Sequence, residues 1–201
     1  MAIMRSEIKK GGGADWLGIK TGTVKSFIDE SAKYEWADVY LVVEFTVEGS
    51  EYPRVCKVVG SFDKEADGQR IKDCTLLKRI TFLFDALGDM GGVNQFGKWV
   101  NSDEKDIDNI VSYMNENHAG KECTIYVYKE LAKNGQAYTR VHNKVLAKSA
   151  SSEKELEDYI TFLKSKGFIK EAPADHQNPT ANGEMPKDGN FVASGIDIAN
   201  L

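Results

Sequence analysis

Apolar and polar residues alternate in three stretches near the start of the chain, and this period of two predicts three β-strands. The stretches cover residues 21–28, 37–49 and 54–62. Short segments connect them, so we expect consecutive antiparallel strands that form a meander. Strict alternation in the first strand would place Lys25 and Phe27 on the same face of the sheet.

Further along the chain the apolar residues follow a spacing of three and four, which predicts helices. A first helix is expected at about residues 75–87, and Gly88 is placed to end it. A second helix is expected to follow a glycine-rich loop, with Ser102 as its cap and an apolar stripe that reaches Met114. A third helix is expected to begin at Ser152, where the spacing of a serine and a glutamate fits a capping box.

Two alternating runs flank Asn134-Gly135, a dipeptide typical of β-hairpins. A two-residue turn would pair Tyr128 with Val141 and mix apolar with polar side chains. A three-residue loop, with Gly135 in the left-handed conformation, pairs Tyr128 with Arg140 instead, and we prefer this register because it separates the two kinds of side chain. It places Ile125, Val127, Val141 and Val145 on one face and Tyr126, Tyr128, Tyr138, Arg140, His142 and Lys144 on the other.

The composition changes the picture mainly at the two ends of the chain. The sequence has 201 residues with 41% hydrophobic and 28% charged residues, which is typical of a globular protein with one principal domain. Residues 171–201 hold five acids against one base and three of the four prolines, so we expect a flexible acidic tail there. Residues 1–19 are expected to be a flexible lead-in, residues 20–150 the main domain and residues 151–170 a C-terminal helical segment.

Several function classes are disfavoured by the sequence. The apolar runs are too short for a membrane span and the first residues do not fit a signal peptide, so we expect a cytoplasmic protein. The cysteines are too far apart to indicate a disulfide framework or a zinc cluster, and we expect reduced thiols. Residues 92–98 resemble the start of a phosphate-binding loop, but Trp99 stands where Ser or Thr would be required. We therefore expect a non-catalytic protein with no cofactor and no metal.

Three meandering strands, a helical segment and a final hairpin follow one another in the order of an OB-fold, a partly open five-stranded barrel. We therefore expect an α+β, mainly β fold, with helices between strands 3 and 4 and a C-terminal helix. Residues 20–150 followed by an acidic tail resemble phage-encoded and bacterial single-stranded DNA-binding proteins of the OB type. The resemblance implies a role in replication or recombination, in the host cytoplasm if the chain is phage-encoded. It also implies a tail that recruits replication proteins and competes with DNA, although this tail ends in FVASGIDIANL rather than in the family's dense acidic run with a terminal aromatic.

Binding to single-stranded DNA requires positive charge along a groove and aromatic rings on which bases stack. Residues 121–148 supply six basic residues against two glutamates, and three tyrosines lie among them. The predicted DNA-binding residues on this hairpin are Tyr126, Tyr128, Tyr138, Arg140, His142 and Lys144. Further candidates on the first three strands are Lys25, Phe27, Trp36, Tyr40, Arg54 and Lys57.

Other interpretations of the same residues remain open. Tyrosine and lysine are common on exposed sheet faces, because tyrosine favours strands and lysine protects edges. A protein-interaction or virion-associated module would use the same sheet face to bind a polypeptide. A nuclease would need carboxylates that cluster in space, which the sequence does not show.

Overall fold

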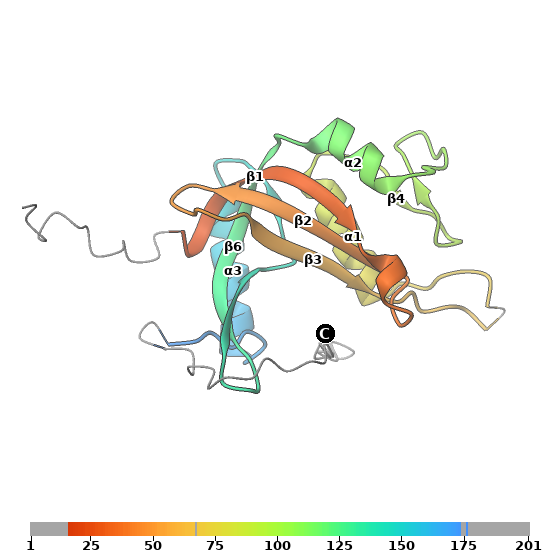
Figure 1. The fold of residues 1–201 in the computed structure, drawn as a ribbon. Coiled ribbons are helices and arrows are strands. Elements are labelled where there is room, and N and C mark those ends of the chain that lie inside the picture. The colour runs from red at the N-terminus through yellow and green to blue at the C-terminus, as the bar shows by residue number, and fades with distance from the viewer. Residues whose placement is uncertain (1–15, 67, 174–175, 177–201) are drawn as a thin grey trace, which may run out of the picture.

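The computed structural model describes residues 16–66, 68–173 and 176 (Figure 1). The fold is α+β and mainly β, as predicted. The described residues form a six-stranded antiparallel sheet, a separate two-stranded sheet, three α-helices and a short 3-10 helix, Ser31–Lys33.

The predicted meander is present. It consists of β1 (Gly18–Asp29), β2 (Val39–Val47) and β3 (Arg54–Gly60), and both neighbouring pairs are antiparallel. Alternate side chains of β2, such as Val43 and Phe45, are fully buried in the main core. The alternation seen in the sequence therefore separates a core face of the meander from an outer face.

The second half of the sheet is built by β6 (Glu122–Leu131), β7 (Ala137–Val141) and β8 (Leu146–Ala147). The strand order is β3-β2-β1-β6-β7, and β8 pairs with β6. The described strands do not close into a barrel. β1 pairs with both β2 and β6, which leaves β3 and β7 at opposite ends of the ladder.

The predicted register of the final hairpin is confirmed. Tyr128 pairs with Arg140 and Val127 with Val141. Gly135 has a φ of 78°, the left-handed conformation that a three-residue loop with a bulge requires. The requirement that apolar and polar side chains lie on different faces of the hairpin was therefore enough to predict how its strands pair.

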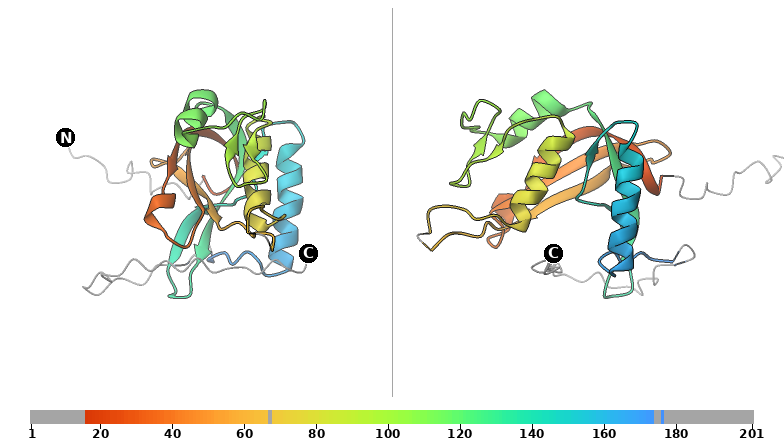
Figure 2. Two further views of the ribbon diagram at one scale, coloured as in Figure 1. Left: turned by 90° about the vertical axis from the view of Figure 1, so that its right-hand side faces the viewer. Right: turned by 180° about the vertical axis from the view of Figure 1, so that it is seen from behind.

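α1 (Thr75–Ala86) and α3 (Ser152–Ser165) pack on opposite faces of the sheet. α1 buries Ile80 and Phe84 against the core face of the meander, and α3 packs on β6. Seen from behind, both helices lie in front of the strands (Figure 2, right). α3 reaches the outer face of β1 near the start of that strand, where Ile19 joins the cluster of Tyr126 and Leu156.

The second helix starts later than predicted. α2 spans Ile110–His118, and its cap is Asn109, whose side-chain oxygen accepts a hydrogen bond from the Ser112 N–H at 3.0 Å. Ser102 does not begin a helix, because the preceding residues form a small hairpin of β4 (Gly92–Val93) and β5 (Trp99–Val100). These strands are too short to show a period of two in the sequence.

The predicted boundaries at both ends also shift. Trp16 and Leu17 pack on the core and β1 begins at Gly18, so the end of the predicted lead-in belongs to the fold. After α3, Glu171 forms a β-bridge with Glu130, so the first residues of the predicted tail lie beside β6. Residues 1–15 and 177–201, where most of the predicted lead-in and tail fall, lie outside the described residues.

The cysteine prediction is confirmed, since Cys56, Cys74 and Cys123 are buried free thiols. None of the helices in the described ranges has both the length and the apolar character that crossing a membrane requires.

Candidate nucleic-acid interface

The polar face of the β6–β7 hairpin is covered where Tyr126 and Tyr128 lie. Their rings stack on each other with centroids 5.5 Å apart, and they pack in a cluster with Leu156 and Ile160 of α3. Tyr126 is only 6% exposed, and its hydroxyl donates a hydrogen bond to Glu171. Burial raises the pKa of Tyr126 to about 12. The expectation that this pair forms an open stacking platform is wrong, because α3 occupies that side of the strand.

Two of the predicted binding residues on the hairpin, Arg140 and Lys144, have carboxylate partners. The Arg140 guanidinium lies 3.0 Å from Glu130, and the Lys144 ammonium lies 3.2 Å from Glu155 of α3. Tyr138 is half-buried near the tip of the hairpin, and its hydroxyl donates to the side chain of Gln136. Glu155 of α3 thus reduces the local excess of positive charge seen in the sequence, whereas Glu130 belongs to the hairpin itself.

His142 lies in an enclosed environment between the sheet and α3. Its Nδ1 accepts a hydrogen bond from the backbone N–H of Lys144 at 3.0 Å, and its ring meets Tyr159 edge to face. Burial lowers the pKa of His142 to about 4, with help from the charges of Arg79 and Lys144. The side chain is therefore neutral at pH 7 and is a poor partner for phosphate.

This burial predicts an acid-sensitive fold. The folded-state pKa of His142 lies below the ordinary value of 6.5, so the unfolded chain binds the proton more tightly. The contribution of neutral, buried His142 to the free energy of unfolding is fully present above pH 6.5. It is lost as the pH falls toward about 4, and the loss is on the order of 3 kcal/mol. Urea unfolding at a series of pH values should show this loss.

The variant His142→Asn isolates the effect, because its side-chain oxygen can replace Nδ1 as acceptor without titrating. We expect the variant to be less stable than the wild type at neutral pH and to show a shallower decline in acid. Parallel pH profiles for the two proteins would contradict the prediction.

Lys25 and Phe27, predicted to share a face of β1, lie on opposite faces. The register shifts between Val24 and Ser26, so Lys25 is the extra residue of a β-bulge. Lys25 is exposed, whereas Phe27 is 2% exposed and belongs to the core. The proposal of Phe27 as a stacking residue is therefore wrong, because the bulge reverses the alternation.

Arg54 and Lys57 also point to different faces. Arg54 pairs with the buried Phe45, and its guanidinium lies 3.8 Å from the ring centre of Trp16. Lys57 pairs with Val42 on the outer face and donates a hydrogen bond to the Tyr40 hydroxyl at 2.9 Å. Of these two candidates, only Lys57 faces the surface that the helices leave uncovered.

Three aromatic residues gather where the β1–β2 loop enters β2. The rings of Tyr34 and Tyr40 stack at 4.4 Å, and the Trp36 ring lies 6.1 Å from Tyr34 and 6.4 Å from Tyr40. We call these three residues the aromatic cluster. Ser31 fixes the loop, because its hydroxyl accepts a hydrogen bond from the Tyr40 N–H at 2.8 Å.

Trp36 is half exposed, at 50%, although Tyr40 beneath it is buried. Trp36 and Tyr40 were predicted as binding residues, and the structure brings them together. Tyr34 was not predicted as a binding residue, although its position two residues before Trp36 could have indicated that the two aromatic side chains lie close together.

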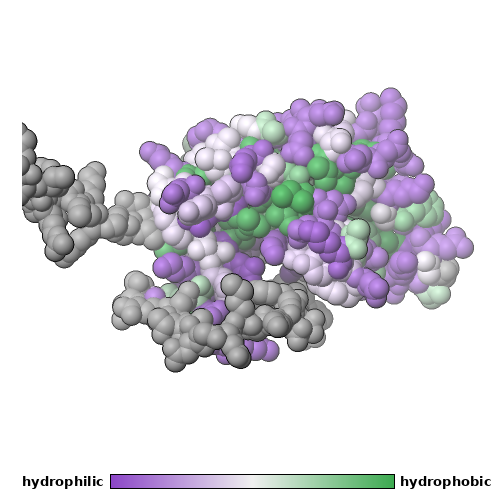
Figure 3. Space-filling view, viewed as in Figure 1, coloured by the Kyte–Doolittle hydropathy of each residue, from purple (hydrophilic) through white to green (hydrophobic). Residues whose placement is uncertain are grey.

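An apolar strip continues from the aromatic cluster along the outer face of β1, β2 and β3. Tyr40 lies beside Val59, Val42 lies between Ile28 and Lys57, and Glu44 lies between Ser26 and Val55. These outward-facing pairs follow directly from the registers. In the space-filling view this region is a hydrophobic band bordered by hydrophilic side chains (Figure 3). The outer face of the meander thus combines the aromatic cluster, the apolar strip and the side chain of Lys57.

A buried polar cluster joins the end of α1 to α2. Asp89 Oδ2 lies 2.6 Å from His118 Nε2 and accepts a hydrogen bond from the Tyr113 hydroxyl at 2.9 Å. Burial favours the neutral acid, but hydrogen bonds from Gly91, Tyr113 and His118 hold the pKa of Asp89 below its usual value. Burial also lowers the pKa of His118. Because Asp89 and His118 are both almost fully enclosed, we assign the cluster to stability.

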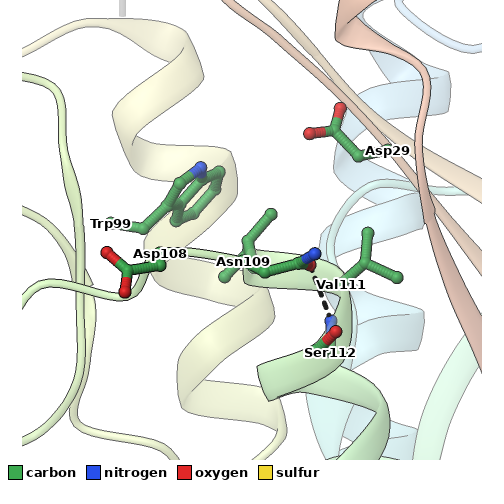
Figure 4. Close-up of a pocket in the computed structure, with 7 residues that line it drawn as sticks. Asp29, Trp99, Asp108, Asn109, Val111 and Ser112 are labelled. Carbon is green, nitrogen blue, oxygen red and sulfur yellow. Dashed lines mark hydrogen bonds between the residues drawn. The ribbon is translucent and has the colours of Figure 1, made fainter.

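A hollow of about 360 Å³ lies beside Trp99 and the start of α2 (Figure 4). Asp108 lies next to Trp99 on one side and Asp29 lies on the other. The lining residues are Asp29, Trp99, Asp108, Asn109, Ile110, Val111 and Ser112. Two carboxylates without a basic side chain in the lining make this hollow unfavourable for phosphate. Among the described residues, no group of three or more His, Cys, Asp or Glu side chains could hold a metal ion.

No protein-family profile matches the chain, and no curated protein matches it significantly.

Proposed function

We propose that the protein is a non-catalytic single-stranded DNA-binding protein that acts in replication or recombination. The observation that carries this proposal is the half-exposed Trp36 above the stacked Tyr34 and Tyr40, at the end of an apolar strip. Aromatic faces next to an apolar floor suit unpaired bases, and stacking on them is largely independent of base identity.

The sheet supports an OB-like arrangement as part of this proposal. The meander and the final hairpin are joined through β1. The Cys56 thiol of β3 also contacts the carbonyl of His142, just after β7, at 3.7 Å. The two ends of the ladder therefore approach each other without pairing, which fits a partly open barrel. OB-folds bind oligonucleotides on strands 2 and 3 and on the loop between strands 1 and 2.

In this proposal the interface moves from the hairpin to the outer face of the meander. Bases stack on Trp36, and Tyr34 and Tyr40 support its ring. Lys57 is placed to meet a phosphate beside the apolar floor, and Lys25 lies on the same face at the bulge. The proposed role of the acidic tail in recruiting replication proteins concerns residues that lie mostly outside the described ranges.

A fluorescence titration tests the proposal. Adding oligo-dT at low salt is expected to quench tryptophan emission, because Trp36 is the most exposed of the described tryptophans. Affinity is expected to fall as salt rises, since each phosphate contact releases counterions. Unchanged emission at low salt, with no binding of a labelled strand, would overturn the proposal.

Lys57→Ala sharpens this test. Loss of one phosphate contact is expected to reduce the slope of log affinity against log salt by about 0.7. Lys166→Ala is the matched control, because Lys166 is an exposed lysine just after α3. Equal salt slopes for the two variants would remove Lys57 from the interface.

One observation favours a second candidate, a polypeptide-binding module. The outer face is apolar, and two of its neighbouring lysines have acidic partners: Lys25 lies 3.3 Å from Glu44 and Lys33 lies 2.8 Å from Glu30. A peptide partner would be retained at high salt, whereas a DNA strand would be released.

A further inference from the structure

Glu44 occupies an unusual position on the outer face of the meander. It lies in the middle of β2, between Ser26 of β1 and Val55 of β3. Its Oε2 accepts a hydrogen bond from the Ser26 hydroxyl at 2.7 Å and lies 3.3 Å from the Lys25 ammonium. The hydrogen bond from Ser26, with that from Lys25, lowers the pKa of Glu44 despite its partial burial. The carboxylate is therefore charged and fixed in orientation.

A fixed negative charge repels a polyanion, so Glu44 weakens binding of a DNA strand to this face unless it also makes a favourable contact with that strand. Ser26 and Lys25 both bind Oε2, and no residue in the described part of the chain donates a hydrogen bond to Oε1. A carboxylate oxygen accepts hydrogen bonds but does not donate them, so a ligand at this position must supply an N–H or O–H group.

Unpaired bases differ in the hydrogen-bond donors that they present. Cytosine, adenine and guanine carry exocyclic amino groups that donate hydrogen bonds, and a Glu side chain can accept from cytosine N4. Thymine and uracil lack an exocyclic amino group and present a carbonyl oxygen in its place, and their remaining donor, N3–H, lies between two carbonyl oxygens that a carboxylate repels.

The spacing along β2 allows stacking and base reading to occur at different nucleotides. Tyr40 and Glu44 share the outer face and are four residues apart, roughly 13 Å in a strand. A base stacked on the aromatic cluster therefore does not occupy the position beside Glu44.

We infer that Glu44 accepts a hydrogen bond from the exocyclic amino group of an unpaired base, so that the interface prefers cytosine-containing strands to those that carry uracil or thymine. This inference rests on the proposed function and adds a base preference to it.

The test compares oligo-dC with oligo-dU of equal length, using the full-length protein and the anisotropy of labelled strands at pH 8. These strands differ in their bases only at the edge that would face Glu44, and neither carries a thymine methyl group. The wild type is expected to bind oligo-dC about tenfold more tightly, which corresponds to one charge-assisted hydrogen bond. Glu44→Gln is expected to reduce this ratio to near one, because its amide can orient to suit either base.

Glu48→Gln is the matched control. Glu48 is exposed in the turn after β2, and this substitution removes the same charge away from the strip. It is expected to strengthen binding to both strands slightly and to keep the wild-type ratio. Equal affinities of the wild type for the two strands, or an unchanged ratio in Glu44→Gln, would overturn the inference and leave single-stranded DNA binding intact. Failure of all strands to bind would overturn the proposed function as well.

Discussion

Replacing Phe27 by alanine is expected to destabilise the protein by about 3–5 kcal/mol, because it leaves a cavity where a fully buried ring was packed. Phe27 lies opposite Val43 in the main core. The hydrogen bond from the backbone N–H of residue 27 to the Asn115 side chain of α2, 3.0 Å long in the wild type, does not depend on the ring and is expected to remain. Urea unfolding followed by circular dichroism measures the loss as a lower midpoint with an unchanged slope.

Ile28→Ala provides the control from the neighbouring position. Ile28 is 41% exposed on the outer face, so its truncation is expected to cost less than about 1.5 kcal/mol. The difference between adjacent residues depends on the bulge at Lys25. If Ile28→Ala proved the more damaging of the two, the bulge would be misplaced and β1 would keep strict alternation.

Replacing Trp36 by alanine is expected to weaken binding to oligo-dT by about 1–3 kcal/mol, the free energy of stacking one base. This corresponds to a loss of roughly 5- to 150-fold in affinity. Fold stability should change little, because Trp36 is half exposed and lies in a loop. Anisotropy of a labelled strand is the suitable measurement, because the substitution removes the fluorophore that reports quenching.

Phe162→Ala is the matched control for this variant. Phe162 is 41% exposed on α3, which packs on β6 and is not part of the proposed interface, so its removal is expected to leave DNA affinity unchanged. Full affinity in Trp36→Ala, measured on a protein with native circular dichroism, would exclude the aromatic cluster as the stacking platform. A parallel loss in both variants would indicate a global effect rather than a base contact.

Local chemistry predicted much of the fold because the relevant interactions are close in sequence. The alternation at residues 37–49 predicted β2, and the apolar spacing at residues 75–87 predicted α1 to within a residue. The pairing of Tyr128 with Arg140 followed from the requirement that apolar side chains share one face. The mistaken start of α2 arose where β4 and β5 are only two residues long and pattern reading has too few positions to work on.

The candidate site was harder to predict because a surface depends on what covers it. The sequence indicated a cationic and aromatic hairpin, but it did not show that α3 would pack over Tyr126 or that Glu155 would pair with Lys144. It also placed Phe27 on the wrong face, because a single bulged residue reverses the alternation that follows it. Trp36 and Tyr40 were selected individually, and the return of the β1–β2 loop onto β2 brings them together with Tyr34.

The sequence by itself determined the strands of the meander, the hairpin register and the helix over residues 75–87, since each depends on periodic burial within a short segment. Only the tertiary structure decided which face stays uncovered and which charges are neutralised. Exposure and ion pairing are set by residues distant in the chain, and a local pattern carries no information about which distant element will pack against it.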